Sequence, residues 1–542
     1  MLTLNRKIKL AALIIFVIIL FTLYEDSILS VSNSDNPIVW TVSSLARTKL
    51  DEKPGNNRSI VLYAARGEYE SFQIGISSHK NNLSNVNISV SDLVSQNNQI
   101  ISKSNITLYR EHYIEVRNSS PTVIASTNLP SGKGWYADAL IPFVNPETQK
   151  DIKGAELDAV PFNVKSGQNQ VIWVDIFVPR TAKAGEYKAV FTVTSDRTET
   201  RGEISLKVWD FVLPLKPSLK SAFAFKEEKY NKQSIIELLK HKFMPVLPSI
   251  NMPIADEREL IDKWGLTTLR LPFWSDATSK KCSIGSPPSV DEISKAVSQH
   301  QRELFLYVRY AHGLDKCPNL FSSVKKWSQA FHQVGIPVMM YVTPNPQLYD
   351  DGSGKGRSAV DIWIVQPKMY KRASERVSEV IAKGDQVWLD NPLMLDSYSP
   401  KLLLDFDPIN FRIIHSFINQ SLGFTGIFYW QIDLWTKNPW QDVEAYIDRK
   451  NRKYPGEGIL VYPGKQVGIN SVVPSMRLKW MRDGVEDYEY IEMMKKVSGK
   501  DAALKITRKV ASDWDNWTRN PQVLESVRQE MGNQIERLSL AK

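Results

Sequence analysis

The feature that most constrains the fold is a change in hydrophobic periodicity at "FVLPLKPSLK", residues 211–220. Before it, from Ile38 to about Val212, apolar and polar residues alternate in segments rich in β-branched and aromatic side chains. Gly, Pro and Asn separate these segments, and helical periodicity is nearly absent. A period of two with frequent turn residues is typical of strands with one buried face. We therefore predict an all-β sandwich over residues 36–215.

After the proline-punctuated boundary, apolar runs of strand length alternate with helical stretches. The runs are "SAFAF", "TTLRLPFW", "LFLYVRY", "PVMMYVT", "DIWIV", "QVWLD" and "GIFYWQI", and the helical stretches include "KQSIIELLKHKF", "SSVKKWSQAFHQVG" and "YKRASERVSEVIAKG". Strand–helix alternation over this length predicts a parallel sheet closed as a TIM-like (β/α)8 barrel over residues 216–500. The tail, residues 501–542, is predicted to be helical.

The N-terminus carries an export signal. Arg6, Lys7 and Lys9 precede the apolar run from Leu10 to Tyr24, and no small-x-small cleavage site follows it. The run is slightly short for a full membrane span but has the length and flank of a signal segment. We expect residues 1–35 to be an uncleaved signal anchor and linker that keeps the globular part outside the cytoplasm, or secreted if the segment is cleaved.

Composition excludes several classes of function. The chain has 542 residues and a formal net charge of +9, but its Lys and Arg are spread out without a dense basic run. We therefore predict no nucleic-acid partner. Gly-rich phosphate loops, a G-x-S-x-G nucleophile motif and metal-ligand spacings are absent, which predicts no cofactor and no bound metal.

In a (β/α)8 barrel the functional groups lie at the C-terminal ends of the strands. Polar and aromatic residues gather at these predicted ends: Arg270, Phe273, Trp274, Arg309, Tyr310, His312, Asp361, Trp363, Trp388, Asp390, Tyr429, Trp430, Gln431 and Asp433. The only two cysteines, Cys282 and Cys317, each follow one of these ends. Both are expected on the functional face, where an exported protein could bridge them.

The segment "RLKWMRDGVEDYEYIEMMKK", residues 477–496, holds five carboxylates. Apolar residues recur at three- and four-residue intervals, which predicts an amphipathic helix packed on the barrel. On this pattern the acids lie on the solvated side or pair with Arg477 and Arg482. The alternative is that paired carboxylates here perform acid/base catalysis.

The same segment resembles the C-terminal signature of the glycoside hydrolase family 123 and domain-of-unknown-function 4091 group. Similar motifs follow in the family's order: "AARGEYESFQIGI", "GWYADALIP", "AGEYKAVFTVTS", "LKVWDFVLPLKPSL", "RSAVDIWIV", "DFDPINFR", "GFTGIFYWQIDLW" and "GEGILVYPG". The resemblance implies a β-sandwich followed by a TIM-like barrel. It also implies hydrolysis of β-linked N-acetylgalactosamine, in which the substrate's acetamido group attacks the anomeric carbon, assisted by an adjacent Asp–Glu pair.

This chain departs from the family where that pair is expected. The strand "ELFLYVRYAHGLDKC" places Ala311 and His312 there, so neither acid is present. The candidates for the missing chemistry are His312, Asp315 and Asp361, the last of which the resemblance makes a substrate-orienting group. Aromatic residues at strand ends can stack on a pyranose, and the candidates for substrate binding are Trp274, Trp363, Trp388, Tyr429, Trp430 and Trp435.

Three interpretations remain open. The chain is a diverged hydrolase acting on amino-sugar (N-acetylhexosamine) glycans, an inactive carbohydrate-binding relative, or an envelope scaffold protein that keeps only the fold. The predicted fold favours the hydrolase. We expect its partners to be a glycan substrate and, through the N-terminal segment, the membrane.

Overall fold

The computed structural model describes residues 37–78, 81–123, 126–196, 198–226, 230–247, 252–277, 282–390 and 396–540. The predicted signal anchor, residues 1–35, lies outside these ranges. Within them, no helix combines the length and the apolar character needed to cross a membrane.

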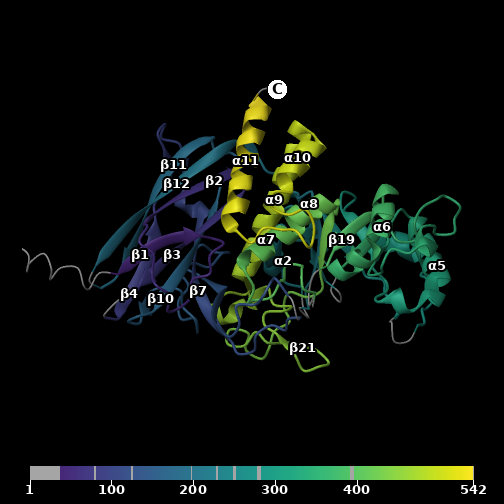
Figure 1. The fold of residues 1–542 in the computed structure, drawn as a ribbon, viewed down its shortest axis with the longest axis horizontal. Coiled ribbons are helices and arrows are strands. Elements are labelled where there is room, and N and C mark those ends of the chain that lie inside the picture. Colours follow the sequence, from purple (N-terminus) through teal and green to yellow (C-terminus); the bar gives the residue numbers. More distant parts are fainter. Residues whose placement is uncertain are drawn as a thin grey trace, which may run out of the picture.

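The N-terminal part consists of two packed β-sheets, as predicted (Figure 1). The first sheet has the antiparallel order β1-β3-β10-β7-β8. The second has the order β2-β12-β11-β4-β9, and β5 pairs with both β11 and β6. The strands are β1 (Ile38–Ser43), β2 (Ser59–Arg66), β3 (Tyr69–Ser77), β4 (Leu83–Val90), β5 (Leu93–Ser95), β6 (Ile100–Ile101), β7 (Ile106–Val116), β8 (Gly134–Pro142), β9 (Phe162–Val164), β10 (Asn169–Phe177), β11 (Gly185–Thr194) and β12 (Glu199–Val212).

The first sheet is buried on both faces. On β3, Phe72, Ile74 and Ile76 point into the core shared with the second sheet. The residues between them face the other way, where Gln73 is fully buried and its amide donates to backbone carbonyls of the loop after β1. Since successive side chains of a strand point to opposite faces, this second buried face packs against the C-terminal part of the chain.

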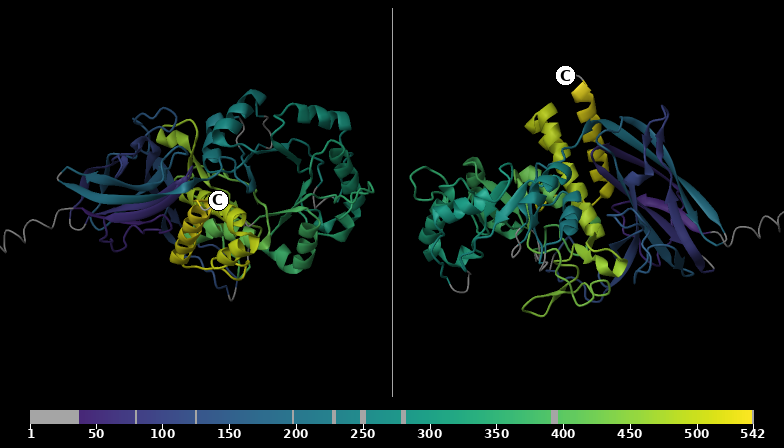
Figure 2. Two further views of the ribbon diagram at one scale, coloured as in Figure 1. Left: turned by 90° about the horizontal axis from the view of Figure 1, so that it is seen from above. Right: turned by 180° about the vertical axis from the view of Figure 1, so that it is seen from behind.

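The second part contains parallel strands with helices outside them, seen as a ring in the left view of Figure 2. The strands are β13 (Lys220–Ala224), β14 (Pro245–Val246), β15 (Thr268–Leu271), β16 (Phe305–Val308), β17 (Met339–Met340), β18 (Ile362–Val365), β19 (Gln386–Leu389) and β20 (Gly426–Tyr429). The intervening helices are α2 (Lys232–Lys240), α3 (Ile254–Trp264), α4 (Val290–Ser298), α5 (Phe321–His332), α6 (Pro367–Ala382), α7 (Pro408–Ile413) and α8 (Asn419–Leu422).

The barrel prediction is confirmed in part. Strands pair in the order β14-β13-β20-β19-β18-β17, and β15 pairs separately with β16. A parallel bridge between Val308 and Val338 joins the two groups on one side. Between β14 and β15 the described residues form no ladder, so the sheet is a large part of a barrel rather than a demonstrated closed one. Short antiparallel pairs follow, β21 (Tyr446–Ile447) with β22 (Lys453–Tyr454) and β23 (Val461–Pro463) with β24 (Val472–Pro474).

The C-terminal helices lie between the two parts, where Figure 1 shows them in yellow. They are α9 (Met476–Ser498), α10 (Lys500–Thr507) and α11 (Pro521–Leu540). The tail is helical as predicted, but α11 covers the sandwich: Gly532 lies against the indole of Trp209, where a Cβ would approach to 2.4 Å.

The prediction that the acids of α9 face solvent is wrong for four of the five, and the alternative, a pairing with Arg482, is confirmed for Asp483 at 2.8 Å. Asp483, Glu486, Asp487 and Glu489 are all buried. Asp487 accepts from Arg412 at 2.6 and 3.0 Å, and Glu489 accepts from the backbone and hydroxyl of Ser218 at 2.6 and 2.8 Å.

The basic residues of α9 reach into the sandwich. Arg477 binds Asp138 of β8 at 2.8 and 2.7 Å, and Lys479 and Arg482 both bind Asp175 of β10 at 2.8 and 2.9 Å. A helix that packs against one layer has an apolar stripe on that side and solvent on the other, but α9 is enclosed by both domains. Its polar side is therefore satisfied by ion pairs instead of water.

Candidate functional site

The strands of the second part bring polar groups together at their C-terminal ends, which we call the mouth. The described groups on its inner side are Arg270, Arg309, Tyr341, Gln366, Asp390, Trp430 and Glu457. The register places Arg270 opposite Tyr307, whose ring lies in the apolar interior with Trp388 and Phe428. Arg309 follows two residues after Tyr307, and its guanidinium lies 4.7 Å from the centre of the Phe428 ring. The inner apolar layer thus ends at this polar rim.

Asp390 follows directly after β19 and is 2% exposed. Its Oδ2 accepts from the Gln366 amide at 3.3 Å, and the Tyr341 phenol lies beside it. Burial raises the pKa of Asp390 to about 7, although Tyr341, Gln366 and the positive charge of Arg309 oppose the rise. A carboxyl that titrates near neutral pH can accept or release a proton under physiological conditions.

Glu457 lies in the loop between β22 and β23 and is fully buried. Its Oε1 accepts from the Trp430 indole at 2.6 Å. Burial raises the pKa of Glu457 to about 8, and the charge of Asp390 adds to the rise. Asp390 and Glu457 therefore form an interacting pair of carboxyls with raised pKa values at the mouth. Such pairs are typical of acid/base sites, although structural networks also produce them.

Each of these carboxyls keeps one oxygen without a protein partner. Oδ1 of Asp390 and Oε2 of Glu457 receive no hydrogen bond from the described residues. Buried polar atoms are nearly always paired in native proteins, and exceptions concentrate at functional sites. Neither residue was selected from the sequence as a catalytic candidate. Asp390 was visible as a strand-end acid. Glu457 lies 28 residues beyond β20, in the segment "GEGILVYPG", which contributed to the family resemblance but did not indicate a catalytic role for Glu457.

Two of the three sequence candidates lie at the mouth. His312 is exposed, with its ring 5.4 Å from that of Tyr341. Asp315 is also exposed, and it accepts a hydrogen bond from the backbone N–H of Thr343 at 2.8 Å. That contact joins the loop after β16 to the loop after β17, so Asp315 fixes the shape of the mouth.

Asp361 lies at the other end of the sheet, and the expectation that it ends its strand is wrong. It precedes β18, where it accepts from His332 at 2.9 Å, Arg357 at 2.7 Å and the backbone N–H of Val338 at 2.7 Å. These contacts hold the pKa of Asp361 below its usual range against the opposing effect of burial. His332 also binds Asp351 at 2.7 Å. Asp361 thus belongs to an ion-pair network at the N-terminal ends of the strands.

The aromatic candidates divide in the same way. Trp363, Trp388 and Tyr429 are fully buried, and none of them presents a ring to solvent. Trp363 packs outward toward the helices and Trp388 inward into the apolar interior. Trp388 is in register with Ile364, the residue after Trp363, and successive residues of a strand point to opposite faces. A role for these three in stacking on a sugar does not fit their burial.

Trp274, Trp430 and Trp435 keep exposed surface. Trp274 is 43% exposed after β15. Trp430 is half-buried at the mouth beside Glu457, and Trp435 is half-buried with its indole donating to the carbonyl of Val461 at 2.8 Å. Trp430 therefore combines an accessible ring with a direct contact to one of the paired carboxyls.

Cys282 and Cys317 form a disulfide, with their Cα atoms 5.4 Å apart. It joins the segment after β15 to the 3-10 turns after β16, as expected for two residues on one face. The described residues contain no group of three or more His, Cys, Asp or Glu arranged to hold a metal ion.

Two family models match the chain. The glycoside hydrolase 123 N-terminal domain matches residues 41–195, and the glycoside hydrolase 123 catalytic domain matches residues 372–494. The second match includes Asp390, Trp430, Glu457 and α9. No curated protein matches the sequence.

Solved structures give the same comparison at the level of the fold. A family 123 glycoside hydrolase from Clostridium perfringens, studied for glycolipid glycan hydrolysis, shares 13% identity at a TM-score of 0.63, over 93% of this chain and 97% of that one. Two β-glucuronidases are much less similar. β-Glucuronidase 3 from Bacteroides uniformis shares 9% identity at a TM-score of 0.28, over 77% of this chain and 50% of that one. A β-glucuronidase from Parabacteroides merdae shares 10% identity at a TM-score of 0.28, over 78% of this chain and 50% of that one.

Proposed function

Because this chain belongs to glycoside hydrolase family 123, we propose that its mouth hydrolyses the glycosidic bonds of amino-sugar glycans. The observation that carries the assignment to this site is the interacting pair Asp390 and Glu457, buried at the strand ends with pKa values raised to about 7 and about 8. The pair replaces the Asp–Glu pair that the family resemblance implied after β16, where this chain has Ala311 and His312. In this proposal the catalytic site is diverged.

The two carboxyls divide the work through their different pKa values. Near neutral pH Glu457 holds its proton and donates it to the glycosidic oxygen as the bond from that oxygen to the anomeric carbon breaks. Asp390, when ionised, accepts the N–H of the 2-acetamido group, whose carbonyl oxygen attacks the anomeric carbon. Deprotonated Glu457 then takes a proton from the water that opens the cyclic intermediate, which restores both groups. Trp430, held by Glu457, offers its ring to the apolar face of the sugar.

The substrate class is proposed from two supports. The resemblance implies N-acetylgalactosamine as the sugar, and the solved relative from Clostridium perfringens is described for glycolipid glycans. We extend the fold proposal in the same way: the eight parallel strands close as a TIM-like barrel around the mouth.

The cellular setting is part of the proposal. The apolar segment of residues 10–24 anchors the protein to a membrane, with the globular part outside the cytoplasm, or is removed to release it. The disulfide Cys282–Cys317 fits this location, since oxidising compartments preserve disulfides.

The test is hydrolysis of aryl β-N-acetylgalactosaminide, with aryl β-N-acetylglucosaminide and aryl β-galactoside for comparison. Asp390→Asn and Glu457→Gln should each lower kcat/KM by at least ~10²-fold. The controls Asp315→Asn and His312→Gln change polar groups at the same mouth and should retain most activity.

Two results would contradict the assignment. Full activity in both Asp390→Asn and Glu457→Gln would remove them from the chemistry. Glycan binding by wild-type protein without turnover of any substrate would indicate the inactive carbohydrate-binding relative.

A further inference from the structure

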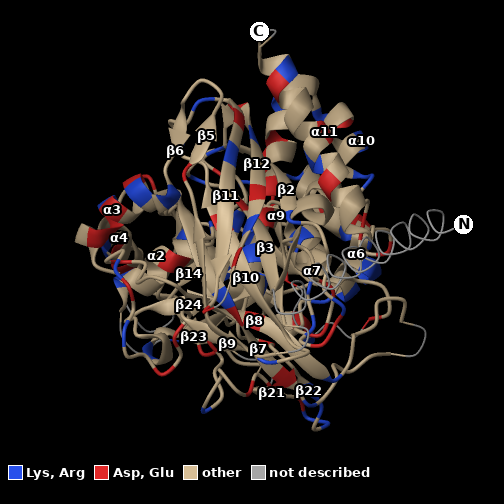
Figure 3. Cartoon of the chain, turned by 90° about the vertical axis from the view of Figure 1, so that its left-hand side faces the viewer, with Lys and Arg blue, Asp and Glu red and all other residues tan. Residues whose placement is uncertain are grey.

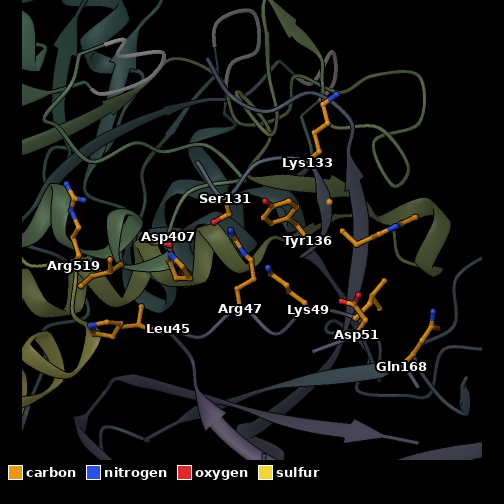
Figure 4. Close-up of a pocket in the computed structure, with 16 residues that line it drawn as sticks. Leu45, Arg47, Lys49, Asp51, Ser131, Lys133, Tyr136, Gln168, Asp407 and Arg519 are labelled. Atoms are coloured by element: carbon orange, nitrogen blue, oxygen red, sulfur yellow. The ribbon is translucent and has the colours of Figure 1, made fainter. Parts of the chain in front are cut away.

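A cavity of about 630 Å³ lies away from the strand ends, between the sandwich and the C-terminal elements (Figure 4). Its walls come from the loop after β1, the segment leading into β8, the first residues of α7 and the segment before α11. In Figure 4, Arg47, Tyr136 and Asp407 lie toward the middle of the view, with Lys133, Gln168 and Arg519 around them. Segments that are far apart in the sequence thus form one site.

The cavity is electropositive. Four cationic residues line it, Arg47, Lys49, Lys133 and Arg519, against two acidic ones, Asp51 and Asp407. None of the four forms a salt bridge in the part of the chain that the structure describes. On the strands and helices of the face shown in Figure 3, residues of both signs of charge occur. An unbalanced group of cations in a hollow attracts anionic ligands.

Arg47 is held rigidly in the wall. Its Nη1 donates to the carbonyls of Leu404 and Phe406, and its guanidinium lies 5.4 Å from the ring of Tyr136 and 5.1 Å from that of Trp480. Its Nε and Nη2 have no hydrogen-bond partner among the described residues. Burial lowers the pKa of Arg47 to about 10, so it remains cationic at neutral pH. Arg47 therefore contributes a fixed positive charge to the cavity wall.

Trp135 supplies an aromatic surface to the same cavity. It stands at the beginning of β8 and is 51% exposed, whereas the strand from its third residue onward is buried. A large exposed indole next to charged hydrogen-bonding groups is the combination that binds sugars, since the ring stacks on a pyranose and the polar groups bind its substituents.

We propose that this cavity is a second glycan-binding site, which takes an oligosaccharide bearing sulfate or carboxylate groups. Trp135 stacks on a sugar ring, and Lys49, Lys133 and Arg519 bind the anionic substituents. The site is built on residues outside the catalytic pair and does not depend on the hydrolytic function proposed above.

One segment connects this cavity with the mouth. The connection that begins at Asp390 ends at Asp407 in the cavity wall. Its second half is tied to the segment leading into β8, because Thr127 donates to the carbonyl of Ser397 at 3.1 Å and Ser131 donates to that of Asp405 at 2.7 Å. A glycan bound in the cavity therefore contacts the same connection that carries Asp390.

The test measures binding by calorimetry to the full-length chain in mild detergent, in the Asp390→Asn background so that no ligand is consumed. Three hexasaccharides serve as probes: sulfated chondroitin, unsulfated chondroitin, which has only carboxylates, and neutral chitohexaose. Either anionic probe should bind more tightly than chitohexaose, and the comparison between them identifies the preferred substituent. The affinity should fall as salt is raised.

Variants locate the binding. Trp135→Ala should weaken it at least ~10-fold, and Lys133→Gln should weaken it less while flattening its salt dependence. The matched control Lys188→Gln removes an exposed lysine of β11 outside the cavity and should change nothing. In the otherwise wild-type chain, Trp135→Ala should leave hydrolysis of small aryl glycosides unchanged.

The proposal is overturned if no probe binds, if chitohexaose binds as tightly as the anionic probes, or if Trp135→Ala binds normally. The two proposals are tested separately, because binding in the cavity requires no turnover. Asp390→Asn should lose catalysis while binding of the anionic probes is unchanged.

Discussion

Asp138→Ala should be among the most destabilising single substitutions in this protein. Asp138 of β8 and Arg477 of α9 both have fully buried side chains, and two hydrogen bonds of 2.8 and 2.7 Å join them. The same carboxylate accepts from the Tyr462 hydroxyl at 2.5 Å. Alanine would leave the guanidinium charged in the interior with only the carbonyls of Gly456 and Ile459 as acceptors.

The expected magnitude follows from the loss of a buried partner. Breaking a buried ion pair on one side costs about 3–5 kcal/mol, because the remaining charge stays desolvated. Arg47 increases the cost here, since the negative charge of Asp138 also acts on its guanidinium, and its removal leaves Arg47 and Arg477 to repel each other. Asp138→Asn keeps a hydrogen-bond acceptor and should cost less. Asp138→Leu combined with Arg477→Met removes both charges and should recover much of the loss.

The assay is guanidinium chloride unfolding followed by far-ultraviolet circular dichroism and by tryptophan fluorescence. Two probes are needed because a two-domain chain can unfold in steps. The pair spans the domain boundary, so Asp138→Ala should also separate the two transitions. The control is Glu303→Gln, which breaks an exposed pair with Arg258 at 2.7 Å and should leave the midpoint unchanged. A loss below ~1 kcal/mol in Asp138→Ala would refute the reasoning, because it would mean that water or another group compensates Arg477.

Three further predictions follow from the site and its supports. The pH profile of kcat/KM should be a narrow bell. Activity should rise as Asp390 ionises with a pKa of about 7 and fall as Glu457 loses its proton with a pKa of about 8, both limbs being properties of the interacting pair. A broad plateau from pH 5 to about 9 would contradict this. The double variant Cys282→Ser, Cys317→Ser opens a loop with a sequence separation of 35 and should lower the free energy of unfolding by about 4 kcal/mol. Denaturation of the variant, the wild type and the reduced wild type measures this, and the reduced wild type should match the variant. Gly484→Ala in α9 places a Cβ 2.4 Å from a backbone carbonyl of α7 and should lower the free energy of unfolding by about 1–3 kcal/mol, which thermal unfolding would measure. An unchanged stability would show that the two helices separate easily.

The sequence predicted what local periodicity encodes. Alternation identified the sandwich strands, and the alternation of strands and helices identified the parallel sheet, because both patterns repeat within a few residues. The disulfide was foreseen because both cysteines follow strand ends. The exposure of individual aromatics was not: Trp363 and Trp388 occupy neighbouring strands with the same local pattern, yet one packs outward and the other inward.

The candidate site was only half visible for a related reason. Asp390 lies at a strand end and could be noted as a polar group there, but its raised pKa depends on its burial in the folded chain. The side chains that contact it, Tyr341 and Gln366, follow two other strands. Asp361 was expected to end its strand as Asp390 does, but it directly precedes β18. A shift of a few residues in a strand boundary moves a carboxylate from one end of the sheet to the other, and the sequence pattern does not fix boundaries that closely.

The charges of α9 show how the domain arrangement changes the interpretation of a sequence. A row of acids beside an apolar stripe ordinarily indicates a solvated helix face. In this protein the row is buried because both domains enclose the helix. Asp487 pairs with Arg412 and Arg528, and the basic residues of the same helix bind Asp138 and Asp175 of the sandwich. Buried ion pairs contribute little net stability compared with apolar packing, but they penalise any displacement that breaks them. The sandwich and the barrel strands are therefore held at a defined separation, which fixes the position of the electropositive cavity relative to Asp390. A change at the contact between α9 and the sandwich that leaves both domains folded but loosens this junction, such as Asp175→Asn in β10, should weaken hydrolysis of long anionic glycans more than that of aryl glycosides. Equal effects on both substrates would show that the junction does not coordinate the two sites.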